Sequence, residues 1–156
     1  MAEPIYRRVL VKVSGEALAG TGGAGIQQAT LERIAADLVA TQKLGVSIGI
    51  VVGGGNMVRG VQMSGKGIPR LTGDLMGMLA TVMNALALES AIEAAGGAAR
   101  TMSAVTMPEI CETYERRRAL RHLGKNRMPI IVFSIQESRA IETVLRGKGR
   151  ATIVNS

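Results

Sequence analysis

The sequence predicts an α/β fold, a three-layer α/β/α sandwich built around a mostly parallel sheet. One observation is that apolar segments rich in β-branched residues alternate with helical patterns along the chain. Another is that glycine-rich or glycine-bearing turns directly follow two of the predicted strands. Strands separated by helices pair in parallel, and the helices cover both faces of the sheet. Ligands of such folds bind beyond the carboxyl ends of the strands.

The first part of the chain contains two predicted strands, 6–13 and 46–52. Between them, apolar residues recur at helical spacing and predict a helix that Gly45 ends: Leu31, Ile34, Ala35 and Leu38. A glycine-rich stretch precedes this helix and is predicted to be a mobile loop: Gly20, Thr21, Gly22, Gly23, Ala24 and Gly25.

The rest of the chain repeats the alternation. Residues 53–73 are rich in glycine and proline and are predicted to be a loop. Asp74 is an acidic residue of the kind that favours a helix N-terminus, so a helix is predicted to begin there and to end at Gly96-Gly97. Its apolar stripe comprises Leu75, Met78, Leu79, Val82 and Leu86. The elements predicted beyond it are a strand at 98–103, a helix at 113–123, a strand at 129–135, a helix at 137–146 and a strand at 151–154.

Length and composition indicate one globular domain of five strands, spanning residues 1–156. Hydrophobic residues make up 47% of the 156 residues and charged residues 20%, which argues against disorder. No apolar run reaches the roughly 18 residues expected of a membrane span, and Met1–Pro4 lacks the features of a signal peptide. The single cysteine, Cys111, excludes an internal disulfide and provides no metal-ligand cluster. These observations predict a cytoplasmic protein.

The chain is basic, with a formal net charge of +7. Arginine and lysine gather in two places, Arg116, Arg117, Arg118 and Arg121 in one, and Arg146, Lys148 and Arg150 in the other. A basic surface permits nucleic-acid binding, but it equally fits a solvated helix face or a site that attracts nucleotides. With two tyrosines, one phenylalanine and no tryptophan, the chain has few rings on which bases can stack. Nucleic acid is therefore not the favoured partner.

Three consecutive glycines, Gly53 to Gly55, follow the strand at 46–52. Without Cβ atoms the backbone turns sharply and its amides approach a ligand closely, which is typical of a phosphate cradle. Arg59 adds a planar cation suited to phosphate oxygens. The alternative is a loop that only turns the chain.

Lys12 stands in an otherwise apolar strand, just before Ser14-Gly15-Glu16. If that strand is covered on both faces, a lysine is costly there unless its ammonium group reaches a partner. At the carboxyl end of the strand it is placed to neutralise charge on a transferred phosphoryl group. The alternative is a lysine that extends to water or pairs with Glu16.

Better-known nucleotide motifs do not fit. Val58 stands where the dinucleotide pattern needs a third glycine or alanine, and Gly67 replaces the hydroxyl residue of a P-loop. His122, the only histidine, has no convincing serine or cysteine partner nearby and is predicted to lie on the surface of the arginine-rich helix. The sequence therefore does not favour hydrolase or redox chemistry.

Three segments together resemble bacterial UMP kinases of the amino-acid kinase superfamily. Val11-Lys12-Val13-Ser14-Gly15-Glu16-Ala17-Leu18 looks like the first phosphate loop of that family, and Val52-Gly53-Gly54-Gly55-Asn56-Met57-Val58-Arg59-Gly60 looks like the second. The segment from Gly73-Asp74-Leu75-Met76-Gly77 to Asn84 is close to the helix motif that separates UMP kinases from other members.

The resemblance implies ATP-dependent phosphorylation of UMP to UDP in pyrimidine nucleotide biosynthesis, with Lys12 as the catalytic residue. The residues expected to contact ATP are Lys12, Val13, Ser14, Gly15, Gly55 and Arg59, and those expected to contact UMP are Gly54 and Asp74. It also implies that Mg²⁺ is held mainly by ATP rather than by a dedicated protein site. The stretch from Gly20 to Gly25 is expected to belong to a region linked to allosteric activation by GTP. The expected assembly is a hexamer of identical chains.

The resemblance is incomplete. Residues 1–124 resemble the UMP-binding half of the family, and residues 127–156 resemble its extreme C-terminus. A large central block between them is missing, and that block carries most of the adenine pocket and a second catalytic lysine. Phosphoryl transfer relies on several positioned groups at once, so the alternative is a nucleotide-binding remnant that lacks activity.

Overall fold

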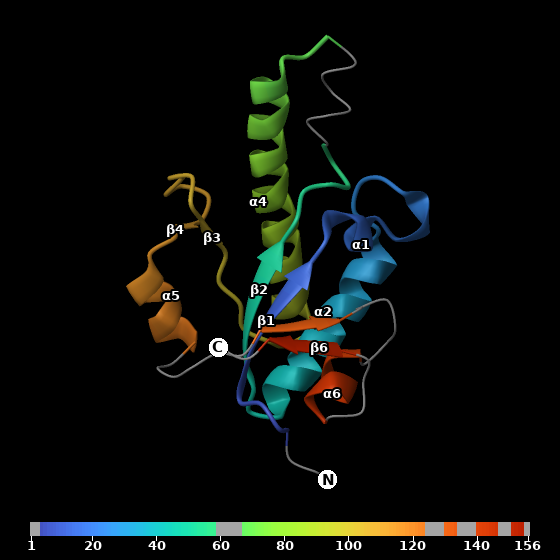
Figure 1. The fold of residues 1–156 in the computed structure, drawn as a ribbon, viewed down its shortest axis with the longest axis vertical. Helices are drawn as coiled ribbons and strands as arrows, with labels where there is room; N and C mark the ends of the chain where they lie inside the picture. Colours follow the sequence, from blue (N-terminus) through green and yellow to red (C-terminus); the bar gives the residue numbers. More distant parts are fainter. Residues whose placement is uncertain (1–3, 59–66, 124–129, 134–139, 147–150, 155–156) are drawn as a thin grey trace.

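A computed structural model describes residues 4–58, 67–123, 130–133, 140–146 and 151–154. Its main sheet has the strand order β2-β1-β5-β6, formed by β1 (Arg8–Val13), β2 (Ser47–Val52), β5 (Ile130–Phe133) and β6 (Ala151–Val154). Strand β1 pairs in parallel with both β2 and β5, and β6 runs antiparallel to β5 (Figure 1). The predicted α/β class with a mostly parallel sheet is confirmed.

The hydrophobic core lies between one face of this sheet and helices α1 (Gly15–Ala19), α2 (Gln28–Lys43), α4 (Arg70–Ala94) and α6 (Ala140–Leu145). Alternate residues of β1 point into it, and Val9, Val11 and Val13 are at most 2% exposed. Helix α2 contributes the predicted stripe to the same cluster. It ends where expected, since Gly45 adopts a φ of 78° that other residues rarely accept.

The opposite face of the sheet carries α5 (Arg116–Leu123), whose Leu123 lies near Gly49 and Leu10. Helices therefore lie on both faces, but they cover them unequally. Lys12 is exposed, and Val51, its register partner on β2, is 49% exposed. The expectation that Lys12 sits in a doubly covered strand is wrong, because α5 shields only part of this face.

The predicted strand at 98–103 does not join the main sheet. Only β3 (Met102–Ser103) forms, and it pairs in parallel with β4 (Glu112–Thr113) in a separate two-stranded sheet. Hydrogen bonds explain the difference: the Thr101 amide donates to Glu89 Oε2 on α4 at 2.9 Å, and its carbonyl accepts from the Glu112 amide at 3.2 Å. The main sheet therefore has four strands in the described part of the chain, not the five expected.

Helix α4 begins at Arg70, after Pro69, rather than at Asp74. Pro69 is the N-cap residue, and its ring fixes φ at −54°, close to the helical value, so the end of the predicted loop at 53–73 is helical instead. Much of the predicted stripe is also exposed: Leu75, Met78 and Leu79 are 53%, 46% and 50% exposed, whereas Val82 is buried. Figure 1 shows the reason, because the first half of α4 extends beyond the sheet.

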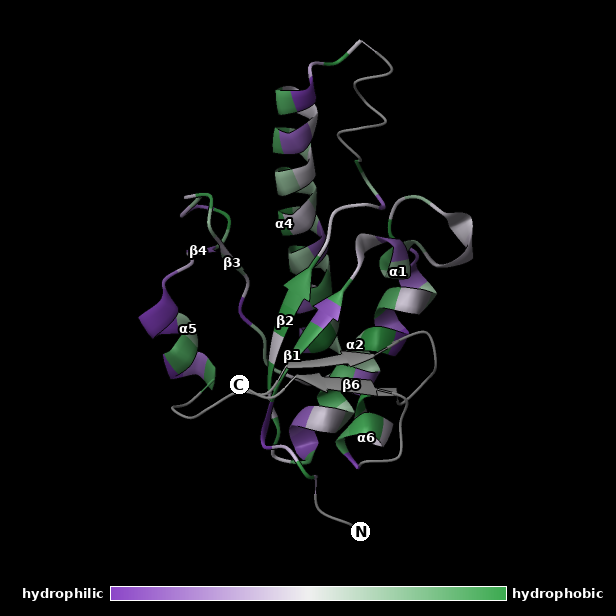
Figure 2. Ribbon diagram, viewed as in Figure 1, coloured by the Kyte–Doolittle hydropathy of each residue, from purple (hydrophilic) through white to green (hydrophobic). Residues whose placement is uncertain are grey.

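Helix α4 is long and apolar enough to cross a membrane, with a mean hydropathy of 1.5 in an 18-residue window of which 28% is buried. Figure 2 shows hydrophobic residues along its length. The chain has no uninterrupted apolar run of this length, as expected; α4 passes on its mean hydropathy, because a window can contain polar and one or two charged residues and still have a high mean. Core helices of soluble proteins pass the same test, so the feature by itself is weak evidence for a membrane.

Candidate active site

Two backbone loops meet at the carboxyl edge of β1 and β2, the edge where ligands of parallel sheets bind. The Gly53 amide donates to the Val13 carbonyl at 2.8 Å, so β1 and β2 stay paired up to the point where each strand turns into its loop. Ser14 then caps α1, with its Oγ accepting from the Ala17 amide at 3.3 Å. This short helix was not predicted from the sequence.

Gly15 allows the two loops to approach closely. A Cβ at Gly15 would lie 2.5 Å from Asn56 Oδ1 and 2.6 Å from the Gly55 nitrogen, distances that real Cβ atoms do not show. At Gly53 a Cβ would lie 3.1 Å from the Gly15 nitrogen. The predicted ATP-binding residues Val13, Ser14, Gly15 and Gly55 are therefore brought together, with backbone against backbone.

Lys12 lies at the same edge as these loops, one residue before Val13. Its side chain is exposed on the sheet face opposite the core, beside Val51. An exposed ammonium group at the end of the strand is available to a ligand without a desolvation cost to the folded protein. Lys12 is therefore a candidate because of its place at the end of the strand, and not because it is a buried charge.

Gly54 packs against the middle of α4. A Cβ there would lie 2.7 Å from the Gly77 carbonyl oxygen and 2.9 Å from the Ala80 Cβ. The Gly54 carbonyl accepts from the Met57 and Val58 amides at 3.0 and 3.2 Å, which closes the turn after the glycines. The loop is therefore held between β2 and α4.

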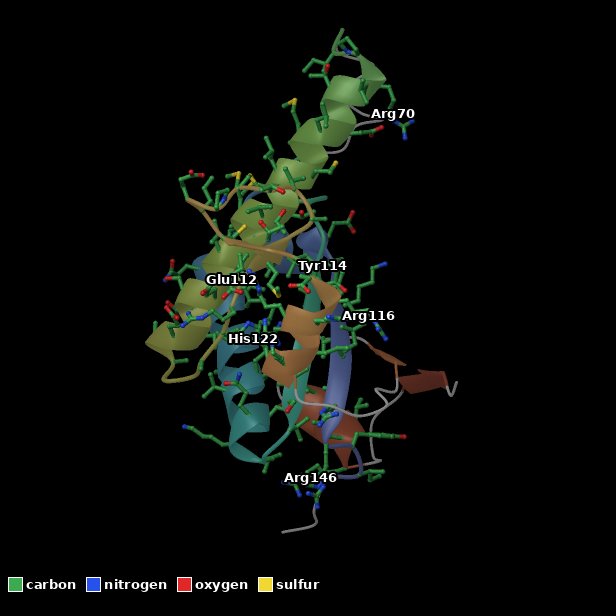
Figure 3. The ribbon with its side chains drawn as sticks, turned by 90° about the vertical axis from the view of Figure 1, so that its left-hand side faces the viewer. Arg70, Glu112, Tyr114, Arg116, His122 and Arg146 are labelled. Atoms are coloured by element: carbon green, nitrogen blue, oxygen red, sulfur yellow. The ribbon has the colours of Figure 1, made fainter. Side chains whose placement is uncertain are left out.

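Asp74 lies one helical turn from this contact. It precedes Gly77 by three residues, which is about 4.5 Å along a helix axis and leaves both residues near one face. Its carboxylate accepts hydrogen bonds from Arg70 Nε at 3.0 and 3.1 Å, and its side chain is 51% exposed. Arg70 itself lies at the far end of α4 (Figure 3). Arg59, the remaining predicted ATP ligand, is outside the described residues.

The stretch from Gly20 to Gly25 contains regular structure that was not predicted. It contains the 3₁₀ helix η1 (Gly20–Gly22), and Gly20, Gly23 and Gly25 all adopt positive φ. The Gly25 amide donates to the Asn56 carbonyl at 3.0 Å, so the end of this stretch is attached to the second glycine loop.

Sequence reasoning missed the roles of Asn56 and Asn84, which it treated only as parts of motifs. Both are buried, at 4% and 0% exposure, and their side-chain amides bond to each other. Asn84 also donates to the Gly53 carbonyl at 2.7 Å. A polar residue inside an apolar helix stripe was a usable signal, because a buried amide needs partners.

Other groups lie away from these loops. His122 is on the exposed surface of α5, as expected, with its Nε2 3.5 Å from Glu112 Oε2 (Figure 3). One cavity of about 480 Å³ lies between α4, β4 and α5, and another of about 500 Å³ lies between α2 and α4; neither is lined by either glycine loop. Within the described ranges, no three acidic, histidine or cysteine residues gather in a way that could hold a metal.

A model of the amino acid kinase family matches residues 7–150. This chain belongs to the amino acid kinase family. The uridylate kinase of Bradyrhizobium sp. (strain BTAi1 / ATCC BAA-1182) is 58% identical over 131 residues, which are 84% of this chain and 55% of that relative. The uridylate kinase of Rhodopseudomonas palustris (strain BisA53) is 56% identical, again over 84% of this chain and 55% of that relative. The chain thus spans about half the length of the curated relatives it matches.

Solved structures of family members agree with the fold. The UMP kinase of Bacillus anthracis superposes with a TM-score of 0.70 at 37% identity, over 76% of this chain and 49% of that chain. The UMP kinase of Ureaplasma parvum gives a TM-score of 0.81 over 97% of this chain and 100% of that chain. At 20% identity, the second match supports the fold alone.

Proposed function

We propose that this chain is a UMP kinase by descent, transferring the γ-phosphoryl group of ATP to UMP to give UDP. The observation that carries the proposal is the meeting of two glycine-bearing loops at one strand edge, with Lys12 beside them. The identity of 58% to a uridylate kinase favours this substrate over other phosphoryl acceptors.

The residues divide into a donor side and an acceptor side. On the donor side, Ser14, Gly15 and Gly55 offer amides to the ATP phosphates, with Val13 beside them. Arg59 is assigned to the same side on the family resemblance alone. Lys12 stabilises charge on the transferring group. On the acceptor side, Gly54 and Asp74 bind UMP, at sites about one turn of α4 apart.

Magnesium is assigned to the nucleotide. Mg²⁺ keeps several waters and is often bound through substrate phosphates and only one or two carboxylates. Among the described residues no acidic cluster competes for it, and the exposed Asp74 carboxylate is paired with Arg70. In this arrangement the ion neutralises phosphate charge, while Lys12 and the loop amides orient the phosphates.

Self-association and regulation are further parts of the proposal. Leu71, Leu75, Leu79 and Met83 on α4 are 72%, 53%, 50% and 54% exposed, a concentration of apolar surface that favours contact with another copy of the chain. A homo-oligomer, with a hexamer as the family form, is therefore expected in light scattering. A cytoplasmic location and an effect of GTP through the Gly20 to Gly25 stretch are proposed on family resemblance.

The second candidate is a nucleotide-binding remnant without catalysis. The observation that favours it is that the chain spans only 55% of the length of the uridylate kinase it matches. Phosphoryl transfer that lacks several stabilising groups slows about tenfold for each 1.4 kcal/mol lost. This candidate predicts stabilisation of the fold by UMP without formation of UDP.

The deciding experiment measures UDP formation from UMP and ATP with Mg²⁺. Lys12→Ala is expected to lower the rate by about 100-fold or more, because the charge of the transferring group loses its cation. Lys43→Ala is the matched control, since Lys43 is an exposed lysine in the last turn of α2. Equal turnover in wild type and Lys12→Ala would contradict the kinase proposal, and a UMP-dependent rise in thermal stability would then support the remnant.

A further inference from the structure

The two buried asparagines form a closed ring of hydrogen bonds. Asn56 Nδ2 donates to Asn84 Oδ1 at 3.1 Å, and Asn84 Nδ2 donates to Asn56 Oδ1 at 2.6 Å. Each amide has one N–H left, and each N–H binds a backbone carbonyl: Asn84 bonds to Gly53 at 2.7 Å and Asn56 bonds to Gly25 at 2.6 Å. All four side-chain N–H groups are thus satisfied.

This ring fixes the orientation of both amides. Rotating either one by 180° would face oxygen with oxygen and leave N–H groups against donors. Because Asn84 is 0% exposed and Asn56 is 4% exposed, water cannot replace a lost partner. The pair therefore holds one arrangement.

The ring joins three segments that are distant in sequence. Asn84 belongs to α4, Asn56 follows the three glycines, and Gly25 ends the Gly20 to Gly25 stretch. The glycines have no side chains, although the backbone of Gly54 packs closely against α4. The position of the loop therefore also depends on backbone hydrogen bonds and on neighbours such as Asn56 and Asn84.

We propose that Asn84, acting with Asn56, is a positioning residue for the phosphate-binding loop. It touches no ligand itself, but holds Gly53 against α4 so that the amides of Gly54 and Gly55 face the nucleotide. Through Asn56 it also ties Gly25, and the stretch before it, to the same loop. This inference rests on the proposed function, because it assumes that the loop binds nucleotide.

The experiment compares Asn84→Ala with Thr41→Val in the full chain, by calorimetric titration with UMP and with ATP and Mg²⁺. Thr41 is the matched control: it is 0% exposed and its hydroxyl donates to the Asp37 carbonyl within α2, away from the loop. Both variants are expected to lower the thermal midpoint. Only Asn84→Ala is expected to weaken nucleotide binding, by about tenfold or more, because small misplacements of binding groups have large effects.

The outcomes separate the inference from the function. If the wild type binds nucleotide and Asn84→Ala binds it equally well, the positioning role is wrong and the proposed function stands. If the wild type binds neither UMP nor ATP, both the positioning role and the proposed function are wrong. A double variant, Asn56→Ala with Asn84→Ala, is expected to weaken binding by less than the sum of the two single effects, since the two residues share one ring. Fully additive effects would contradict the shared role.

Hydrogen exchange tests the inference without any variant, in case Asn84→Ala does not fold. UMP is expected to slow amide exchange in residues 53–58 and in residues 22–27 together, because Asn56 bonds to Gly25 through both its side chain and its backbone. Slowing confined to residues 53–58 would contradict the link between the two segments.

Discussion

The two halves of α4 have similar composition and opposite surroundings. In the C-terminal half, Leu88 and Ile92 are each 2% exposed and pack on the core. In the N-terminal half, Leu71 and Leu75 are 72% and 53% exposed. Apolar side chains at helical spacing therefore do not by themselves indicate a core. Burial depends on whether the sheet extends beneath that part of the helix.

The boundary between the two halves falls at the candidate site. Gly54 meets α4 at Gly77, Ala80 and Thr81, and Asn84 begins the buried half. The site is thus placed where α4 leaves the sheet, with a packed support on one side and exposed surface on the other. Three predictions test this division.

Leu88→Ala is expected to have the largest effect on stability. The side chain is 2% exposed, so its removal leaves a cavity in the core and costs about 3 kcal/mol in the free energy of unfolding. Urea denaturation measures this cost. Met78→Ala is the matched control on the same helix: Met78 is 46% exposed and is not among the residues proposed to contact another copy of the chain, so about 0.5 kcal/mol or less is expected. Equal costs at both positions would show that the two halves do not differ in burial.

Gly54→Ala is expected to have an intermediate effect. The added methyl group would lie 2.7 Å from the Gly77 carbonyl oxygen, which is backbone within a helix and cannot move easily. Forcing the loop away from α4 is expected to cost about 1–3 kcal/mol and to weaken UMP binding. Thermal unfolding with and without UMP measures both effects. An unchanged UMP affinity would argue against Gly54 as a binding residue.

Gly77→Ala is expected to have the smallest effect, and in the opposite direction. Among the described residues, a Cβ at Gly77 would meet only the Val58 carbonyl oxygen, at 4.0 Å, which leaves room for the methyl group. Replacing a glycine inside a helix by alanine is expected to stabilise the fold by about 0.5–1 kcal/mol. A fall in the thermal midpoint would contradict this expectation, because it would mean that the added methyl group pushes the glycine loop away from α4.

Much of the fold was predictable from local patterns. The β-branched residues Val9, Val11 and Val13 and the helical spacing of Leu31, Ile34 and Leu38 are each properties of a short segment, and the structure confirms both elements. The separate pairing of β3 with β4 was not predictable, because it accompanies a hydrogen bond from Thr101 to Glu89 on another element. The start of α4 was predicted four residues too late, although Pro69 is a local signal for a helix start.

The candidate site was predictable only in part. Glycines after adjacent strands indicated where the two loops would meet, because parallel strands end at one edge of a sheet. The meeting of Gly15 with Gly55 confirms that expectation. The support from Asn84 was not predicted, because the side chain reaches partners 28 and 31 residues away in sequence.

The sequence by itself determined the four strands of the main sheet, helix α2 and the two glycine loops, since periodicity and backbone freedom are properties of short segments. Only the tertiary structure decided which apolar residues of α4 are buried, that Lys12 is exposed, and that Asn84 lies beneath the loop. These features depend on which segments pack together, and hydrogen bonding and burial between distant segments leave no periodic signal in the chain.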